Sequence, residues 1–102
     1  MYKSISPVNN SNTPSIASDG TAIAAATTGG RRGWSVQNLG TNALFVRLGA
    51  SASSTVFHFV LKASTGNDDG TGGSVEQSVG AVYQGEISIA GTSPRYTALE
   101  MK

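Results

Sequence analysis

The sequence predicts an all-β protein, an antiparallel β-sandwich or jelly-roll-like barrel of about eight short strands with an extended N-terminal arm. Three observations point to this class. The chain of 102 residues suits a single domain, several short segments alternate apolar and polar residues, and 13 glycines are available for the turns between them. We therefore expect an arm over residues 1–20 and a sandwich domain over residues 21–102.

The arm is predicted because residues 1–20 are polar and carry few sizeable aliphatic side chains, those of Ile5, Val8 and Ile16. Ordering the backbone costs about 1–2 kcal/mol per residue, whereas full burial of each aliphatic side chain contributes roughly 1.5–3 kcal/mol. The segment therefore cannot order by itself. Main-chain pairing with a sheet edge would order it, and we expect that edge on a neighbouring subunit. The alternative is a frayed terminus without a role.

Residues 21–28 are expected to form a strand with small side chains, because the segment is short, rich in threonine and bounded by glycines. Its three consecutive alanines favour a helix by propensity alone. The turn that follows carries two adjacent cations, Arg31 and Arg32. Two charges make a weak electrostatic footprint, so a solvated turn is favoured over a phosphate contact. An interface salt bridge is the intermediate alternative.

The densest apolar alternation lies in residues 34–62, which hold the only tryptophan and all three phenylalanines. We expect strands over residues 34–38 and 43–48, and the four residues between them predict an antiparallel hairpin. After a flexible connection over residues 49–54, a third strand is expected over residues 56–62. This strand carries large apolar side chains on both faces, which indicates cover from a second sheet or from another subunit.

The rest of the chain is predicted to return in shorter strands. A glycine-rich loop over residues 63–73 comes first, and strands or irregular returns follow within residues 74–83 and 86–90. A closing strand is expected over residues 95–101, with Leu99 on its core face. The predicted core comprises Trp34, Val36, Leu44, Val46, Leu48, Phe57, Phe59, Leu61, Ile87, Ile89 and Leu99.

The overall composition argues against several classes of partner. Charged residues are 13% of the chain and the formal net charge is +1, far from the basic excess of nucleic-acid-binding domains. The absence of cysteine excludes disulfides and thiolate metal sites. No apolar run approaches the roughly 20 residues that cross a bilayer, and the first residues lack the apolar segment of a signal peptide. We expect no cofactor, no metal, no nucleic acid and no membrane partner.

His58 is the only imidazole in the chain, and no sequence motif links it to a nucleophile and an orienting acid. We therefore interpret it as a packed or interfacial histidine and expect no enzymatic activity. Asn67, Asp68 and Asp69 offer oxygen ligands for Ca²⁺, but the spacing and the final glutamate of an EF-hand are missing. A solvated turn is the favoured interpretation of this acidic pair.

A family resemblance is carried by four runs of the sequence: QNLGTNALFVRLG, SSTVFHFVLK, NDDGTGG and IAGTSPRYT. These runs resemble small virion structural proteins of tailed bacteriophages, most of all head decoration or capsid cement proteins. The resemblance covers most of the chain, from Arg32 to about Thr97. It implies a structural role at the capsid surface and carries no catalytic residues with it.

On this resemblance we expect a viral structural protein that binds the assembled capsid surface and stabilises it as a decoration or cement protein. Binding only the assembled state stabilises that state by mass action, and a homotrimer would engage several sites at once. The expected partners are the major capsid protein and further copies of the chain. The protein would be made in the host cytoplasm and located in the virion. Candidate interface residues are Tyr2, Lys3, Ile5, Val8, Ile16, Arg31, Arg32, His58, Asp68 and Asp69.

Two other hypotheses differ in what they require of the fold. A neck-, tail- or fibre-associated virion module that binds host carbohydrate would expose Trp34 or Tyr96 beside a shallow cleft, as a platform for sugar rings. A small enzyme would require His58 and a carboxylate within hydrogen-bond reach of each other in a cleft.

Overall fold

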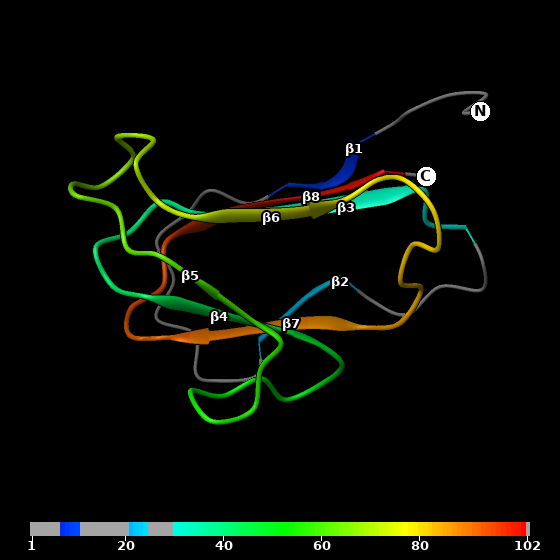
Figure 1. Cartoon of the computed structure of the whole chain (residues 1–102), viewed down its shortest axis with the longest axis horizontal. Helices are drawn as coiled ribbons and strands as arrows, with labels where there is room; N and C mark the ends of the chain where they lie inside the picture. The colour runs from blue at the N-terminus through cyan, green and yellow to red at the C-terminus, as the bar shows by residue number, and fades with distance from the viewer. Residues whose placement is uncertain (1–6, 11–20, 25–29, 102) are drawn as a thin grey trace.

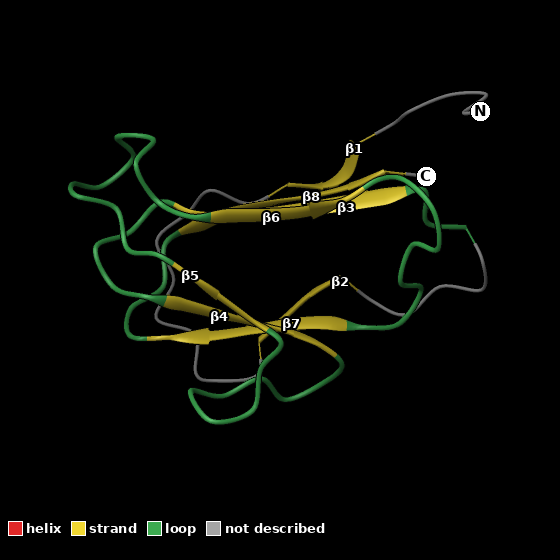
Figure 2. Cartoon of the chain, viewed as in Figure 1, coloured by secondary structure: helices red, strands yellow, loops and turns green. Residues whose placement is uncertain are grey.

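A computed structural model describes residues 7–10, 21–24 and 30–101. All regular elements within these residues are β-strands (Figure 2). Predictions for residues 1–6, 11–20, 25–29 and 102 lie outside the described residues. In chain order, the strands are β1 (Pro7–Asn10), β2 (Thr21–Ala24), β3 (Gly33–Asn38), β4 (Leu44–Leu48), β5 (Phe59–Leu61), β6 (Ser74–Gln77), β7 (Ile87–Gly91) and β8 (Tyr96–Met101).

The strands form two antiparallel sheets that lie as two layers (Figure 1). One layer consists of β8, β3 and β6, with β1 paired to the free side of β8. The other consists of β7, β4 and β5, with β2 paired to the free side of β7. The all-β class is therefore confirmed, and the two layers agree with a small β-sandwich.

The predicted hairpin between residues 34–38 and 43–48 is wrong, because β3 and β4 lie in different layers. β3 pairs with β8 along its whole length, whereas β4 pairs with β5 and β7. The main chain of Leu39 continues the pairing with β8 past the end of β3, since its N–H donates to the Arg95 carbonyl at 2.8 Å. The short connection therefore crosses between the layers instead of reversing within one sheet.

Only Phe59–Leu61 of the predicted strand over residues 56–62 forms β5. The residues before it leave the sheet because Ser53 and Val56 close a turn, in which the N–H of each donates to the carbonyl of the other at 3.0 and 3.2 Å. The two faces of β5 differ in burial. Leu61 is buried, whereas Val60, which points the other way, is 51% exposed.

The core lies between the two layers, as the apolar alternation predicted. The rings of Trp34 in β3 and Phe59 in β5 meet across the layers with their centroids 6.3 Å apart. Leu48 and Phe59 are half-buried and pack against the core. Seven of the predicted core residues are buried, and these predictions are confirmed: Trp34, Val36, Leu44, Val46, Leu61, Ile87 and Ile89.

Phe57 and Leu99 are wrong predictions for the core. Phe57 is exposed because it precedes β5 and stands outside the layers. Leu99 is half-buried on the outer side of β8. Glu100 lies on the opposite, inward-facing side of β8 and is buried. Glu100 faces inward because it pairs with Arg31, with 2.8 Å between carboxylate oxygen and Nε. Since side chains alternate along a strand, Leu99 then has to face outward.

β1 belongs to the predicted arm, and it pairs with β8 of the same chain, Pro7 opposite Met101 and Asn10 opposite Leu99. The sheet edge that orders residues 7–10 thus lies within the chain, whereas we expected it on a neighbouring subunit. β2 covers the start of the strand predicted for residues 21–28. The boundary between arm and sandwich domain at residue 20 stays a prediction.

Candidate functional site

The outer face of the sheet formed by β7, β4 and β5 carries a group of apolar side chains. Phe45 in β4 lies opposite Val60 in β5. Both point away from the core, because their neighbours Leu44 and Leu61 point into it. The ring of Phe57 packs on that of Phe45, with the centroids 5.0 Å apart. Two separate segments therefore contribute to one apolar surface.

These side chains are open to solvent. Val56 is 43% exposed, Phe57 39% and Val60 51%, while Phe45 is half-buried beneath Phe57. We call Phe45, Phe57 and Val60 the apolar patch, because the pairing of β4 with β5 and the ring contact place these three side chains together. Large apolar side chains gathered on one exposed face indicate a contact surface for a partner, so the patch is the candidate functional site.

The connection over residues 49–58 holds part of the patch against the outer face of the sheet, below β4 and β7 in Figure 1. Its anchor is Ser88 in β7, whose hydroxyl accepts the N–H of Ala52 at 2.9 Å and donates to the Gly49 carbonyl at 2.7 Å. Ser88 and Ala52 are both buried. A serine in an otherwise apolar strand therefore fastens this connection instead of solvating the sheet.

His58 links the end of the connection to β4. Its imidazole Nδ1 accepts a hydrogen bond from the main-chain N–H of Leu48 at 2.9 Å. The main-chain N–H of His58 donates to the Val46 carbonyl at 2.8 Å. The side chain is exposed, so His58 is not packed within this chain, and its interfacial role stays a prediction. Through these contacts His58 fixes the position of Phe57, its neighbour in the patch.

The outer face of the other sheet is mostly polar, with Leu99 in β8 as an apolar residue opposite Ser35. Ser35 and Gln37 in β3 lie opposite Glu76 and Ser74 in β6, and Thr97 in β8 lies opposite Gln37. These side chains take part in lining a shallow hollow of about 300 Å³. The two outer faces of the sandwich therefore differ in chemistry, since one presents hydroxyls, an amide and a carboxylate beside Leu99, and the other presents the apolar patch.

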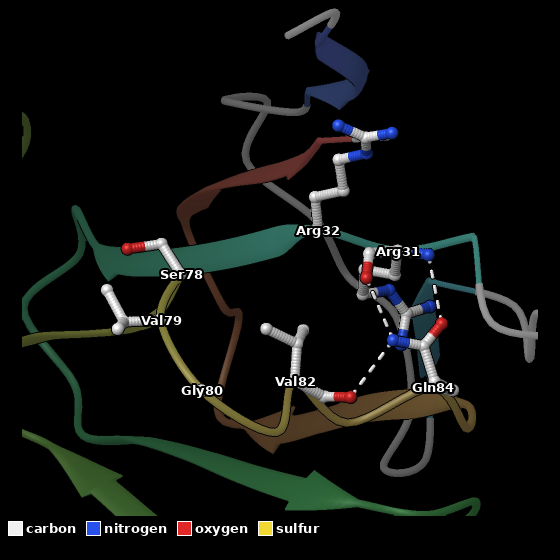
Figure 3. Close-up of a pocket in the computed structure, with 7 residues that line it drawn as sticks. All are labelled: Arg31, Arg32, Ser78, Val79, Gly80, Val82 and Gln84. Carbon is white, nitrogen blue, oxygen red and sulfur yellow. Dashed lines mark hydrogen bonds between the residues drawn. The ribbon is translucent and has the colours of Figure 1, made fainter. Parts of the chain in front are cut away.

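A larger pocket of about 510 Å³ lies beside Arg31, at the end of the sandwich where β3 begins (Figure 3). The Arg31 side chain is fully buried. Its Nε donates to the Glu100 carboxylate at 2.8 Å, and its Nη1 donates to the carbonyls of Tyr83 and Gly85, each at 2.8 Å. The predicted solvated turn is wrong for Arg31, because the loop over residues 78–86 closes over its guanidinium.

Gln84 fastens the same loop to the main chain of Arg31. Its Oε1 accepts the Arg31 N–H at 2.9 Å, and its Nε2 donates to the carbonyls of Arg31 and Val82 at 2.8 and 2.9 Å. Arg32 is half-buried and points away from Arg31 and Gln84 (Figure 3). Because Arg31 and Gln84 are engaged within the chain, this pocket is a weaker candidate site than the apolar patch.

Asp68 and Asp69 lie in an exposed turn, in agreement with the favoured interpretation. The Arg95 guanidinium donates Nε–H and Nη2–H to the two oxygens of Asp68, which lowers the pKa of that carboxyl. Asp69 accepts the hydroxyl and N–H of Thr71 at 2.6 and 2.9 Å, and the pKa of Asp69 is lowered chiefly by these bonds. Within the described ranges, no group of three or more His, Asp or Glu side chains is placed to hold a metal ion.

The predicted interface residues are spread over the molecule. Tyr2, Lys3, Ile5 and Ile16 lie outside the described residues, and Val8 lies in β1. Arg31 is buried at one end of the sandwich, while Asp68 and Asp69 lie in the loop between β5 and β6. Of the described candidates, His58 adjoins the apolar patch.

Sequence reasoning missed the patch itself, because it assigned Phe57 to the core, gave no role to Phe45 and did not identify the face with Val60 as the exposed one. The signal was present in the apolar side chains on both faces of residues 56–62. That pattern indicates that both faces meet apolar groups. It does not reveal which face the chain covers by itself and which face it leaves open.

No protein-family model, curated protein or solved structure matches the chain. The resemblance to phage virion proteins therefore stays a prediction from the sequence. None of the described residues belongs to a helix long and apolar enough to cross a membrane.

Proposed function

We propose that the protein is a bacteriophage structural protein that attaches to the assembled capsid surface and stabilises it as a decoration or cement protein. The observation that supports this function is the exposed apolar patch on the outer face of the β7–β4–β5 sheet. An exposed group of aromatic and aliphatic side chains gains free energy when a partner removes it from water. The patch thus supports binding to a surface, and the sequence resemblance suggests which surface.

The polar groups of the described residues also fit a binding role. Each buried side-chain nitrogen and oxygen among them has a hydrogen-bond partner within the chain. A catalytic or ligand site usually keeps polar groups aimed at its substrate. Among the described residues, the buried side chains of Arg31, Asn38 and Ser88 hold loops to the sandwich.

The finer parts of the proposal are the eight-stranded jelly-roll arrangement, the homotrimer, the major capsid protein as partner and the location in the virion. Many weak contacts repeated over a shell are sufficient for attachment, above all when one trimer engages several sites. Binding to the assembled shell and not to free subunits stabilises the shell by mass action.

The two other hypotheses lack the features they require. Trp34 and Tyr96 are 2% and 7% exposed, and both belong to the core instead of flanking a cleft. The described hydrogen bonds of His58 join it to main-chain groups of Leu48 and Val46. We therefore advance neither carbohydrate binding nor catalysis as a second function.

The copy number in purified particles tests the proposal. Quantitative mass spectrometry of particles from the phage that encodes the chain should give copies comparable in number to the major capsid subunits. A handful of copies per particle would instead indicate a neck or tail component and would overturn the proposal. Shells that lack the chain should bind the purified protein and withstand higher temperature with it, whereas unassembled capsid subunits, as the control, should not bind it.

A further inference from the structure

Cations flank the apolar patch at both ends. Arg47 follows Phe45 by two residues in β4 and so lies on the same face, with its Nη1 donating to the Ala50 carbonyl at 2.7 Å. Lys62 follows Val60 by two residues and is exposed. Residues 33–67 contain no aspartate or glutamate. The ion pairs of the described residues lie elsewhere, at Arg31–Glu100 and Arg95–Asp68.

A hollow lies next to the patch. It has a volume of about 280 Å³, and the residues that line it are Asn42, Ala43, Phe45, Ser54, Gly91 and Thr92. The ring of Phe45 thus forms a wall shared by the patch and the hollow. A partner with a projecting side chain can seat it here while its flat apolar surface covers Phe57 and Val60.

The charges decide between two occupants of this surface. In a two-fold contact between copies, each patch would face an identical patch, so Arg47 and Lys62 would meet cations of the other copy. Like charges placed opposite one another in an interface are repulsive. A surface with carboxylates around an apolar centre instead neutralises both cations. We propose that the apolar patch docks a protein surface that has an apolar centre and an acidic rim.

This inference rests on the proposed function for the identity of the partner and specifies the chemistry of the capsid site. The outer face of the β8–β3–β6 sheet provides a matched control, because it has the same architecture with polar side chains and the Glu76 carboxylate. Changes made on that face alter charge without touching the patch.

Binding to capsid shells that lack the chain tests the inference within the proposed function. We expect Phe57→Ser to weaken binding by about tenfold or more, because the complex then lacks the aromatic ring that the partner would bury. We expect the double variant Arg47→Glu/Lys62→Glu to weaken it by about tenfold at low salt and to reverse its salt dependence, because salt then screens a repulsion between the glutamates and the acidic rim. The control Glu76→Lys should bind as the wild type does.

The outcomes of this experiment separate the two claims. If the wild type binds shells and the patch variants bind equally well, the inference is wrong and the proposed function stands. If the wild type does not bind shells, the proposed function is wrong. Circular dichroism and thermal unfolding of each variant establish that a loss of binding does not reflect loss of the fold.

A small probe tests the patch chemistry without any capsid. Anilinonaphthalene sulfonate combines aromatic rings with a negative charge, and N-phenylnaphthylamine has the rings without the charge. In NMR titrations the anionic dye should shift the amide signals of Phe45, Phe57 and Val60 and bind several-fold more tightly than the neutral dye. The Arg47→Glu/Lys62→Glu variant should abolish this preference. Shifts confined to the pocket beside Arg31, or equal affinity for both dyes, would overturn the inference.

Sedimentation velocity tests whether a second copy of the chain, instead of a different protein, binds the patch. We expect the wild type and Phe57→Ser to show the same oligomeric state, because the patch faces a different protein. An oligomer that dissociates on Phe57→Ser would assign the patch to self-association, and the inference would then be wrong.

Discussion

Two clusters of buried polar side chains close the opposite ends of the β3–β8 pair, and they differ in charge. Where β3 begins, the guanidinium of Arg31 pairs with the carboxylate of Glu100. Where β3 ends, the neutral amide of Asn38 makes the connections. Both clusters fasten loops to the sandwich. The charged one is stable only while both partners are present, whereas the neutral one depends on the number of hydrogen bonds it completes.

The neutral cluster also joins the two layers. Asn38 belongs to β3, and its Nδ2 donates to the carbonyls of Asn42, Leu61 and Lys62 at 2.8, 3.2 and 3.2 Å. Its Oδ1 accepts the N–H of Gly40 at 2.9 Å. One buried side chain therefore ties β3, the crossing connection and the end of β5 in the other layer. Arg31 holds the loop over residues 78–86, which leads into β7.

The largest expected effect comes from breaking the charged cluster. Arg31→Met leaves the Glu100 carboxylate inside the protein without its cation, and we expect the free energy of unfolding to fall by about 3–5 kcal/mol. Urea unfolding followed by circular dichroism measures the loss. The double variant Arg31→Met/Glu100→Leu removes both charges and should recover a large part of it. A double variant as unstable as the single one would show that the carboxylate is not the source of the loss.

The next largest loss of stability is expected from adding a side chain beside Asn38, a change that removes no polar group. A Cβ added at Gly72 would lie 1.9 Å from the Asn38 carbonyl oxygen and 2.6 Å from the Ser64 hydroxyl. The main chain has to move, so Gly72→Ala should cost about 3 kcal/mol of unfolding free energy. Gly30→Ala is the control, because nothing lies within 4 Å of its Cβ, and it should change stability by less than about 0.5 kcal/mol. Equal stability of the two variants would contradict the crowding at Asn38.

The clusters also explain how far the sequence could predict this fold. Alternation identified Ile87 and Ile89 as inward residues of one strand and Leu44 and Val46 as those of another, and these residues are buried. Periodicity of this kind is local, so a single segment reveals it. It predicts that a strand has a buried face, but it does not identify the strand's neighbours.

Two of the wrong predictions involve partners distant in sequence. The expected hairpin assumed that a short connection reverses the chain, and the contacts of Asn38 with Leu61 and Lys62 direct it across the layers instead. The closing strand turns Glu100 inward because its partner Arg31 lies 69 residues away. In both cases a buried polar side chain overrides the local apolar pattern, and its partner cannot be read from neighbouring residues.

A smaller effect is expected from the anchor of the apolar patch. Ser88→Ala removes the acceptor of the buried Ala52 N–H and the donor to the Gly49 carbonyl, so we expect a loss of about 1–2 kcal/mol. Hydrogen exchange should also quicken in residues 49–58 while the core strands keep their protection. Ser35→Ala on the polar outer face is the control. Exchange in residues 49–58 that matches the wild type would mean that Ser88 does not fasten this connection.

The smallest effect concerns the exposed ion pair at the neutral end. Hydrogen bonds from Arg95 hold the pKa of the Asp68 carboxyl below its usual value. A carboxyl whose pKa is lower in the folded state contributes stability above its unfolded pKa of about 3.9, and this contribution is lost as the pH falls through the folded pKa. Asp68→Asn should therefore be slightly less stable than the wild type near neutral pH, and the difference should close on acidification.

Urea midpoints of both proteins, measured between about pH 7 and pH 3, follow this difference. Asp69 keeps its bonds to Thr71 in the variant, so both proteins retain the acid dependence that comes from Asp69. The Leu39 N–H still donates to the Arg95 carbonyl, because that bond uses only main-chain atoms. Loss of the ion pair should thus leave the Asn38 cluster intact. A difference that persists at the acid end would mean that Asp68 acts through the turn's geometry and not through its charge.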